Sequence, residues 1–283
     1  MRAPSPRTRL AIWALAAAAL IAAALIGTAL FSEAASVTDL SRALSAPGEN
    51  NLVLGGDNVG RDVLARTLAG GGESLAMALA VVALSLLIGA FAGAAAAFAG
   101  GAIEAVVRKI VVVFQAFPSF VLAVAIAGIL GPGMGNMVVA IAAVYWTVLA
   151  RVALNMTASL RASEAIDAAR LCGAGSLAIV ARYIAPKLAG SLAVLATLSV
   201  GDVVLTMAGL SFLGLGPERP TNEWGALMAE AQPVFSLAPW CILAPAAALL
   251  VTVVVFNLLG DTLRDVIDAR TTQESPFSER NRP

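Results

Sequence analysis

The feature that most constrains this chain is a series of apolar runs, each about as long as a lipid bilayer is thick. The runs lie at about Leu10–Phe31, Ser74–Phe98, Val106–Leu130, Asn136–Met156, Leu188–Leu213 and Pro239–Leu259. About 20 apolar residues are enough for a helix to cross the hydrocarbon core. Only 13% of the residues are charged, against about 25% in soluble domains. The sequence therefore predicts an all-α membrane protein with six transmembrane helices.

The basic residues favour one orientation of these helices. With the N-terminus inside, all but four of the 18 Lys and Arg residues lie in cytoplasmic segments or at cytoplasmic span ends, and the exceptions are Arg42, Arg61, Arg66 and Arg219. Cytoplasmic loops of membrane proteins carry an excess of Lys and Arg. We therefore expect both termini in the cytoplasm.

This orientation divides the chain into four parts. We expect a cytoplasmic tail with the first helix (1–31), an extracytoplasmic segment (32–73), a five-helix core (74–260) with a cytoplasmic loop (158–187), and a cytoplasmic tail (261–283). The first run could also be a signal peptide, since Arg2, Arg7 and Arg9 precede it. It is longer than the usual apolar region of about 7–15 residues, so an uncleaved span is favoured.

The loop between the fourth and fifth runs, Ser163–Pro186, is too interrupted to be a span and too long to be a simple turn. Ser163 is placed to cap a first helix, which Gly173 ends. Ser176 is placed to cap a second, which Pro186 ends. The second helix has almost no polar face, because it carries Leu177, Ile179, Val180, Tyr183 and Ile184. We expect a helical elbow that presents an apolar tip to a partner outside the bilayer.

The sequence gives no support for histidine-based catalysis, ATP binding, a disulfide or nucleic acid binding. The chain has no histidine, which removes the usual general base and the common zinc ligand. It has no phosphate-binding GxxxxGK[ST] loop, so ATP, if used, is bound by another subunit. Cys172 and Cys241 are predicted to lie in different environments, which makes a disulfide improbable. The net charge is zero and gives no indication of nucleic acid binding. The glycine clusters 70–72 and 131–133 are interpreted as turns at the membrane surface.

Asp202 is the one carboxylate well inside an apolar run. A charge at mid-membrane costs about 2.5–3.5 kcal/mol on insertion scales. Asp202 should therefore face a water-filled path or a polar partner, or be protonated, and a path role and a structural hydrogen bond remain equally open. Pro118, Pro239 and Pro245 are candidates for kinks or span starts.

The elbow resembles the EAA loop of bacterial ABC-importer permeases. The matching residues are Asp167-Ala168-Ala169, Gly173 and Tyr183-Ile184-Ala185-Pro186. Two positions depart from the family pattern, because Asp167 stands in place of glutamate and Ala185 in place of leucine.

The resemblance extends from about Gly55 to Arg270 and is greatest to the C-type permeases of dipeptide, oligopeptide and nickel importers. Further matches in the family order are Asp57–Arg66, Phe117-Pro118, Trp146 with Arg151, Ser211–Gly216, Trp224-Gly225, Ala238–Trp240 and Asn257–Asp261 with Leu263–Asp265. The family usually has a glutamate at the position of Met207, and the acidic group here is displaced to Asp202.

This resemblance implies a type I ABC-importer permease fold in the bacterial inner membrane. The chain would form half of a translocation path for di- or oligopeptides, beside a second homologous permease. Two cytoplasmic ATPases would bind ATP and Mg²⁺, and an extracytoplasmic binding protein would deliver the solute. From the topology alone, we expect the outer segments near Trp224 and Arg61 to face that binding protein. The chain itself would hold no cofactor or metal and catalyse no reaction.

The resemblance also assigns site residues. The ATPase-coupling loop would use Asp167, Ala168, Ala169, Gly173, Ser176, Leu177, Ile184 and Pro186. For the translocation path we expect Asp202, the carboxylate inside an apolar run, together with Met207 and Ser211. Nickel or another small solute is an alternative cargo. A proton-driven secondary carrier is an alternative of another class, for which further buried charges and inverted halves are expected. A membrane scaffold that conducts no solute is a third.

Overall fold

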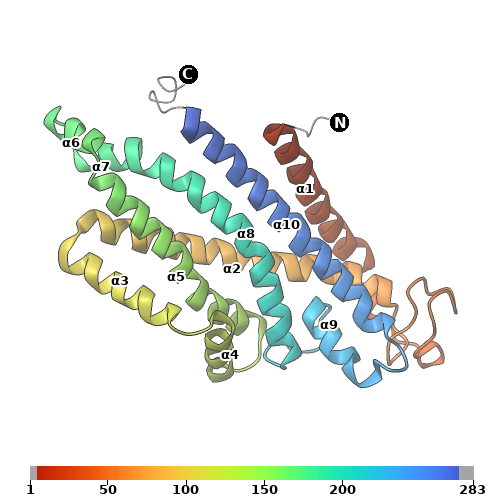
Figure 1. Cartoon of the computed structure of the whole chain (residues 1–283). Helices are drawn as coiled ribbons and strands as arrows, with labels where there is room; N and C mark the ends of the chain where they lie inside the picture. Colours follow the sequence, from red (N-terminus) through yellow and green to blue (C-terminus); the bar gives the residue numbers. More distant parts are fainter. Residues whose placement is uncertain (1–4, 274–283) are drawn as a thin grey trace.

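The computed structural model describes residues 5–273, with side chains as far as Asp268. The helices are α1 (Pro6–Phe31), α2 (Val63–Ala99), α3 (Gly101–Gln115), α4 (Ser119–Leu130), α5 (Met134–Arg161), α6 (Glu164–Leu171), α7 (Ser176–Ile179), α8 (Ala185–Phe212), α9 (Trp224–Ala231) and α10 (Trp240–Gln273). Short 3₁₀ turns lie at Ala34–Ser36, Leu40–Arg42 and Gln232–Val234, and a π-helical turn at Val180–Ile184 joins α7 to α8. No strand occurs among these residues, which confirms the all-α prediction (Figure 1).

Five of the described helical segments are long and apolar enough to cross a membrane: α1, α2, α5, α10 and the continuous stretch Ser176–Phe212. A sixth span is present if α3 and α4 are counted together as one broken crossing. The six predicted runs therefore all correspond to helix, although one of them is not a single rod.

The span predicted at Val106–Leu130 is broken at Pro118, one of the residues expected to kink or start a span. The chain bends by 92° between α3 and α4. Pro118 has no N–H to donate and disfavours helical geometry at Phe117, and it adopts φ −57° and ψ 127° directly before α4. The break thus has a local cause that the sequence did contain.

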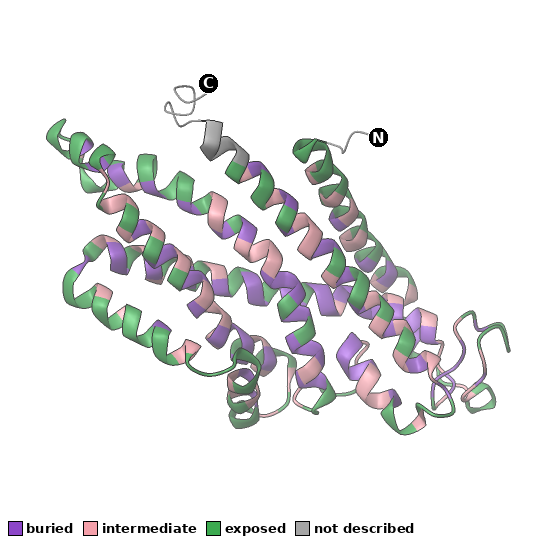
Figure 2. Ribbon diagram, viewed as in Figure 1, coloured by how far each residue is buried: buried purple, intermediate pink, exposed green. Residues whose placement is uncertain are grey.

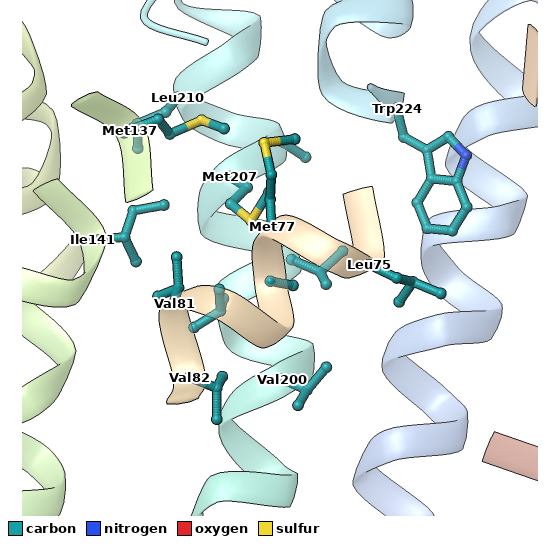
Figure 3. Packing of buried hydrophobic residues seen from close by; sticks show 14 of the residues in the cluster. Leu75, Met77, Val81, Val82, Met137, Ile141, Val200, Met207, Leu210 and Trp224 are labelled. Carbon is teal, nitrogen blue, oxygen red and sulfur yellow. The ribbon is translucent and has the colours of Figure 1, made fainter. Parts of the chain in front are cut away.

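The core lies where α2 packs between α5 and α8 (Figures 2 and 3). Small residues allow these helices to approach closely, as lipid-embedded helices require. A Cβ atom on Gly89 of α2 would lie 2.5 Å from the Trp146 carbonyl oxygen and 2.8 Å from the Leu149 Cβ. The α2–α5 contact therefore depends on the absence of a side chain at this position.

The glycine cluster 70–72 was interpreted as a surface turn, and the structure corrects this. All three residues are buried inside α2, which begins as early as Val63. A Cβ on Gly70 would clash with the Asn222 carbonyl oxygen. Gly72 N donates to the Thr28 hydroxyl at 3.1 Å, and that hydroxyl donates to the Ala69 carbonyl at 2.6 Å. These glycines allow α1 and the segment before α9 to approach α2.

The second cluster does form a turn. Gly131 and Gly133 adopt φ of 82° and 138° between α4 and α5. In Figure 1 the elbow, the start of α1 and the end of α10 lie along the upper edge of the bundle, whereas α9 and the segment before α2 lie along the lower edge. The helices thus separate two polar ends of the molecule.

Candidate functional site

The elbow between α5 and α8 contains a turn at Gly173, within the predicted coupling loop. α6 ends at Leu171, and Gly173 follows with φ 82°. Gly173 N donates to the Arg170 carbonyl at 2.9 Å, and Ala174 N donates to the Ala169 carbonyl at 3.0 Å. This pair of hydrogen bonds is the Schellman motif, which favours glycine at the left-handed position. The prediction that Gly173 ends the first helix is confirmed.

The helix starts differ from the prediction. The Ser163 hydroxyl does not cap α6 and instead donates to the Leu160 carbonyl at 2.6 Å. Ser176 is the first residue of α7, while Gly175 occupies the cap position.

The prediction that Pro186 ends the second helix is wrong. α7 continues through the π-helical turn Val180–Ile184 into α8, where Pro186 lies in the first turn. Proline has no backbone N–H to donate. Where the preceding turn is widened, that N–H would have had no essential acceptor, so the helix can continue through Pro186. The elbow is therefore one end of a long helix and not a separate short rod.

The apolar residues of the elbow divide into two groups. Ile179 and Ile184 are buried on Ile166 of α6, beside Phe98 and Leu160. The expectation that Ile179 and Ile184 point to a partner is wrong, because they pack against their own chain.

The second group points outward. Leu171 and Leu177 are 90% and 83% exposed. Gly173 lies between them, and an added Cβ there would meet no atom within 4 Å. The exposed surface of the elbow is thus an open apolar tip that rests on a packed base.

The remaining loop residues divide by exposure. Asp167, Ala168, Ser176 and Pro186 are exposed, whereas Ala169 is buried. The Asp167 carboxylate lies 3.3 Å from the Arg170 guanidinium. Both groups are exposed, so this ion pair contributes little to stability.

Arg161 attaches the base of the elbow to the bundle. Its guanidinium donates to the carbonyls of Ala97 and Phe98, at 2.8 and 3.2 Å, where α2 ends. It also lies 3.9 Å from the Glu104 carboxylate on α3. Arg161, the last residue of α5, therefore links the base of the elbow to the end of α2 and the start of α3.

The three predicted path residues do not line one surface. Met207 lies beside Met77 in the core and is 1% exposed (Figure 3). Ser211 is also buried, and its hydroxyl lies 3.7 Å from the Met137 sulfur. Asp202 is exposed on another face of α8. In this arrangement Met207 and Ser211 pack helices together, and only Asp202 faces outward.

The opposite end of the molecule is closed by a ring of four charges. The Asp57 carboxylate lies 2.6 Å from Arg61 Nε and 2.7 Å from Arg66 Nη1, and Glu230 on α9 accepts from both arginines, at 2.9 Å from Arg66. Burial favours a higher pKa for the Glu230 carboxyl, but Arg66 and Arg61 outweigh it and hold that pKa below its ordinary value. The ring ties the segment before α2 to α9.

Trp224 belongs to the same construction. Its indole N–H donates to the Thr67 carbonyl at 2.9 Å, and its side chain is buried. The Trp224 side chain therefore holds this end together and is not itself a docking surface. Sequence reasoning missed Glu230. The available signal was an acidic residue on a short helix with no basic residue close to it in sequence, which indicates a partner from a distant segment.

Sequence reasoning also missed a polar groove between α3 and α5, lined by Arg108, Gln115, Arg151 and Asn155. The signal was present as polar residues recurring along one face of each helix. Which residues pair across the groove depends on how the two helices lie against each other, which the sequence alone did not show. No group of acids, cysteines and histidines suited to a metal occurs among the described residues.

Comparison with known proteins adds independent information. The family model described as "Binding-protein-dependent transport system inner membrane component" matches residues 85–273. The nickel transport system permease protein NikC of Escherichia coli (strain K12) is 36% identical over 236 residues, covering 83% of this chain and 85% of the relative. The glutathione transport system permease protein GsiD of Pectobacterium atrosepticum is 38% identical, with coverages of 77% and 72%. The oligopeptide transport system permease protein OppC of Haemophilus influenzae is 34% identical, with coverages of 82% and 75%.

Proposed function

Since the chain belongs to the binding-protein-dependent transport system inner membrane components, as an ABC-importer permease of the peptide and nickel family, we propose that it forms half of a translocation path for peptides. A second homologous permease completes the path. Two cytoplasmic ATPases bind ATP and Mg²⁺ and carry out hydrolysis, so this chain needs no cofactor. An extracytoplasmic binding protein delivers the solute.

The observation that supports coupling to an ATPase is the open elbow. Leu171 and Leu177 are almost fully exposed on either side of Gly173, while Ile166, Ile179 and Ile184 pack beneath them. An apolar tip on a rigid base suits a groove in a cytoplasmic partner. When the ATPase pair closes on ATP, the tip moves with it, and Arg161 carries the displacement to α2 and α3.

The orientation follows from the basic residues. With the elbow in the cytoplasm, both termini are cytoplasmic and the charge ring of Asp57, Arg61, Arg66 and Glu230 faces the binding protein side. The loop 158–187 is then the coupling unit, and 32–73 is the extracytoplasmic segment.

Two cargo classes follow from the relatives. Peptides are supported by the GsiD and OppC relatives, whose named solutes are glutathione and oligopeptides. Nickel is the second candidate, because the NikC relative covers the larger share of both chains.

The test is uptake into proteoliposomes that contain both permeases, both ATPases and the binding protein. We expect ATP-dependent uptake of a labelled peptide by the wild-type complex. Gly173→Trp, which places a bulky side chain at a φ of 82° on the tip, should abolish uptake while the subunit still inserts. Normal uptake by this variant would refute the coupling assignment, and ATP-independent uptake driven by a proton gradient would indicate a secondary carrier.

A further inference from the structure

A groove of about 420 Å³ lies between α3 and α5, with buried Val111 and Leu154 among its walls. Polar side chains meet across it at successive depths. Across the groove Arg108 donates to Asn155 at 2.9 Å and Arg151 donates to Gln115 at 2.9 Å, and beside it Glu104 lies 3.9 Å from Arg161. Gln115 in turn donates to the Thr147 carbonyl at 3.2 Å. A ladder of polar pairs therefore runs along two membrane helices.

The deepest pair lies far from the membrane surface. Glu104 and Arg161 mark that surface, because they lie beside the charged elbow at the end of the bundle. Arg151 lies about 15 Å further along α5 at about 1.5 Å per residue. Arg151 thus lies inside the predicted span Asn136–Met156, in its cytoplasmic half, where a charge should face water or a polar partner.

The charges in the groove do not balance. Arg108 is paired with Glu104 at 2.8 Å. Arg151 is exposed, and no acidic side chain lies within ion-pair distance of it among the described residues. Its guanidinium is oriented by Gln115, and a guanidinium is suited to bidentate recognition of a carboxylate. The groove is therefore an electropositive polar site.

We propose that this groove binds the carboxylate of the transported solute and that Arg151 is its main contact. The inference rests on the proposed function and assigns the permease a contact with a free carboxylate, as peptides carry. A lipid phosphate offers related anionic chemistry, but it would lie at the membrane surface and meet Arg108 or Arg161 first.

The test compares two probes in the reconstituted importer, tri-alanine and its C-terminal amide. Arg151→Gln should raise the KM for tri-alanine uptake about tenfold, which is the usual effect of losing a charge-assisted hydrogen bond. The same variant should change the KM for uptake of the amide by less than about twofold. Arg151→Lys should restore part of the preference. Arg7→Gln, which removes the same charge at the start of α1, should change neither value. The binding protein is the same throughout, so a changed ratio reports on the permease.

Further arms separate the alternatives. Equal effects on both probes, or none, would overturn the proposal, and so would an effect seen only in vesicles with phosphatidylglycerol and not in pure phosphatidylcholine. Wild-type uptake of Ni²⁺ but not of tri-alanine would also overturn it, although the importer function would stand.

If no probe is transported, the proposed function fails, and equilibrium binding of labelled tri-alanine to the complex in nanodiscs decides the groove separately. About tenfold weaker binding by Arg151→Gln supports the assignment. Equal binding by the wild type and the variant, or no binding to the wild type, contradicts it.

Discussion

Truncating Leu177 at the elbow should separate coupling from folding. Its side chain is 83% exposed, so Leu177→Ala removes almost no internal contact, and the free energy of unfolding should change by less than about 0.5 kcal/mol. In an ATPase groove the same side chain would be buried. Full burial of a leucine is worth about 1.5–3 kcal/mol, and a loss of about 2 kcal/mol weakens binding roughly 30-fold at 1.4 kcal/mol per decade.

Ile184 provides the matched control within the same elbow. Its side chain is 1% exposed and packs on Ile166. Ile184→Ala should therefore destabilise the permease by about 2–5 kcal/mol. The difference between the two truncations lies in which surface each side chain contacts.

The assay has two readouts on the permease pair in nanodiscs, titration with fluorescent ATPase and thermal unfolding. Leu177→Ala should lower the ATPase affinity and leave the unfolding temperature unchanged, whereas Ile184→Ala should lower the unfolding temperature. Wild-type ATPase affinity in Leu177→Ala would refute the reasoning. Equal destabilisation by both variants would show that the elbow packs differently.

Other predictions concern the charge ring and the helix contacts. Glu230→Gln should destabilise the protein by about 3 kcal/mol, because it leaves Asp57 as the one carboxylate shared by Arg61 and the buried Arg66, whereas Glu33→Gln at an exposed position should be neutral in denaturant unfolding. Because the pKa of Glu230 is lowered on folding, its stabilisation is complete above the unfolded pKa of about 4.3 and is lost as pH falls through the folded pKa. The cost of Glu230→Gln should thus be constant from about pH 6 to 8 and shrink below about pH 4. Gly89→Leu should force α2 and α5 apart, since an added Cβ would lie 2.5 Å from the Trp146 carbonyl oxygen, and should lower expression of folded protein, while Gly128→Ala, in open space, should not.

The sequence predicted the helices well because a long apolar run has few other stable forms in lipid. It also contained the cause of the α3–α4 break at Pro118, although the 92° angle depends on how both helices pack. Pro186 looked equally like a stop, yet the widened turn before it lets the helix continue. A proline signals a local irregularity, and the neighbouring turns decide whether it becomes a bend, an end or neither.

The errors in side-chain placement have a common origin. Gly70 looked like a turn residue because small residues serve both turns and close helix contacts. Ile184 looked like a docking residue because an apolar side chain does not reveal whether its partner is its own chain or another. Arg151 and Glu230 gain their partners from other helices, so their roles depend on the packing of distant segments.

The central claim, that the Gly173 elbow lies in the cytoplasm and contacts the ATPase, is tested most directly through Cys172. This thiol is exposed beside Gly173, and the chain's second cysteine, Cys241, is buried. A photoreactive maleimide attached at Cys172 in the assembled importer should cross-link to the ATPase, and an impermeant maleimide should label Cys172 only in inside-out vesicles. Labelling from the outer face, or cross-links confined to the permease's own chain, would contradict the account.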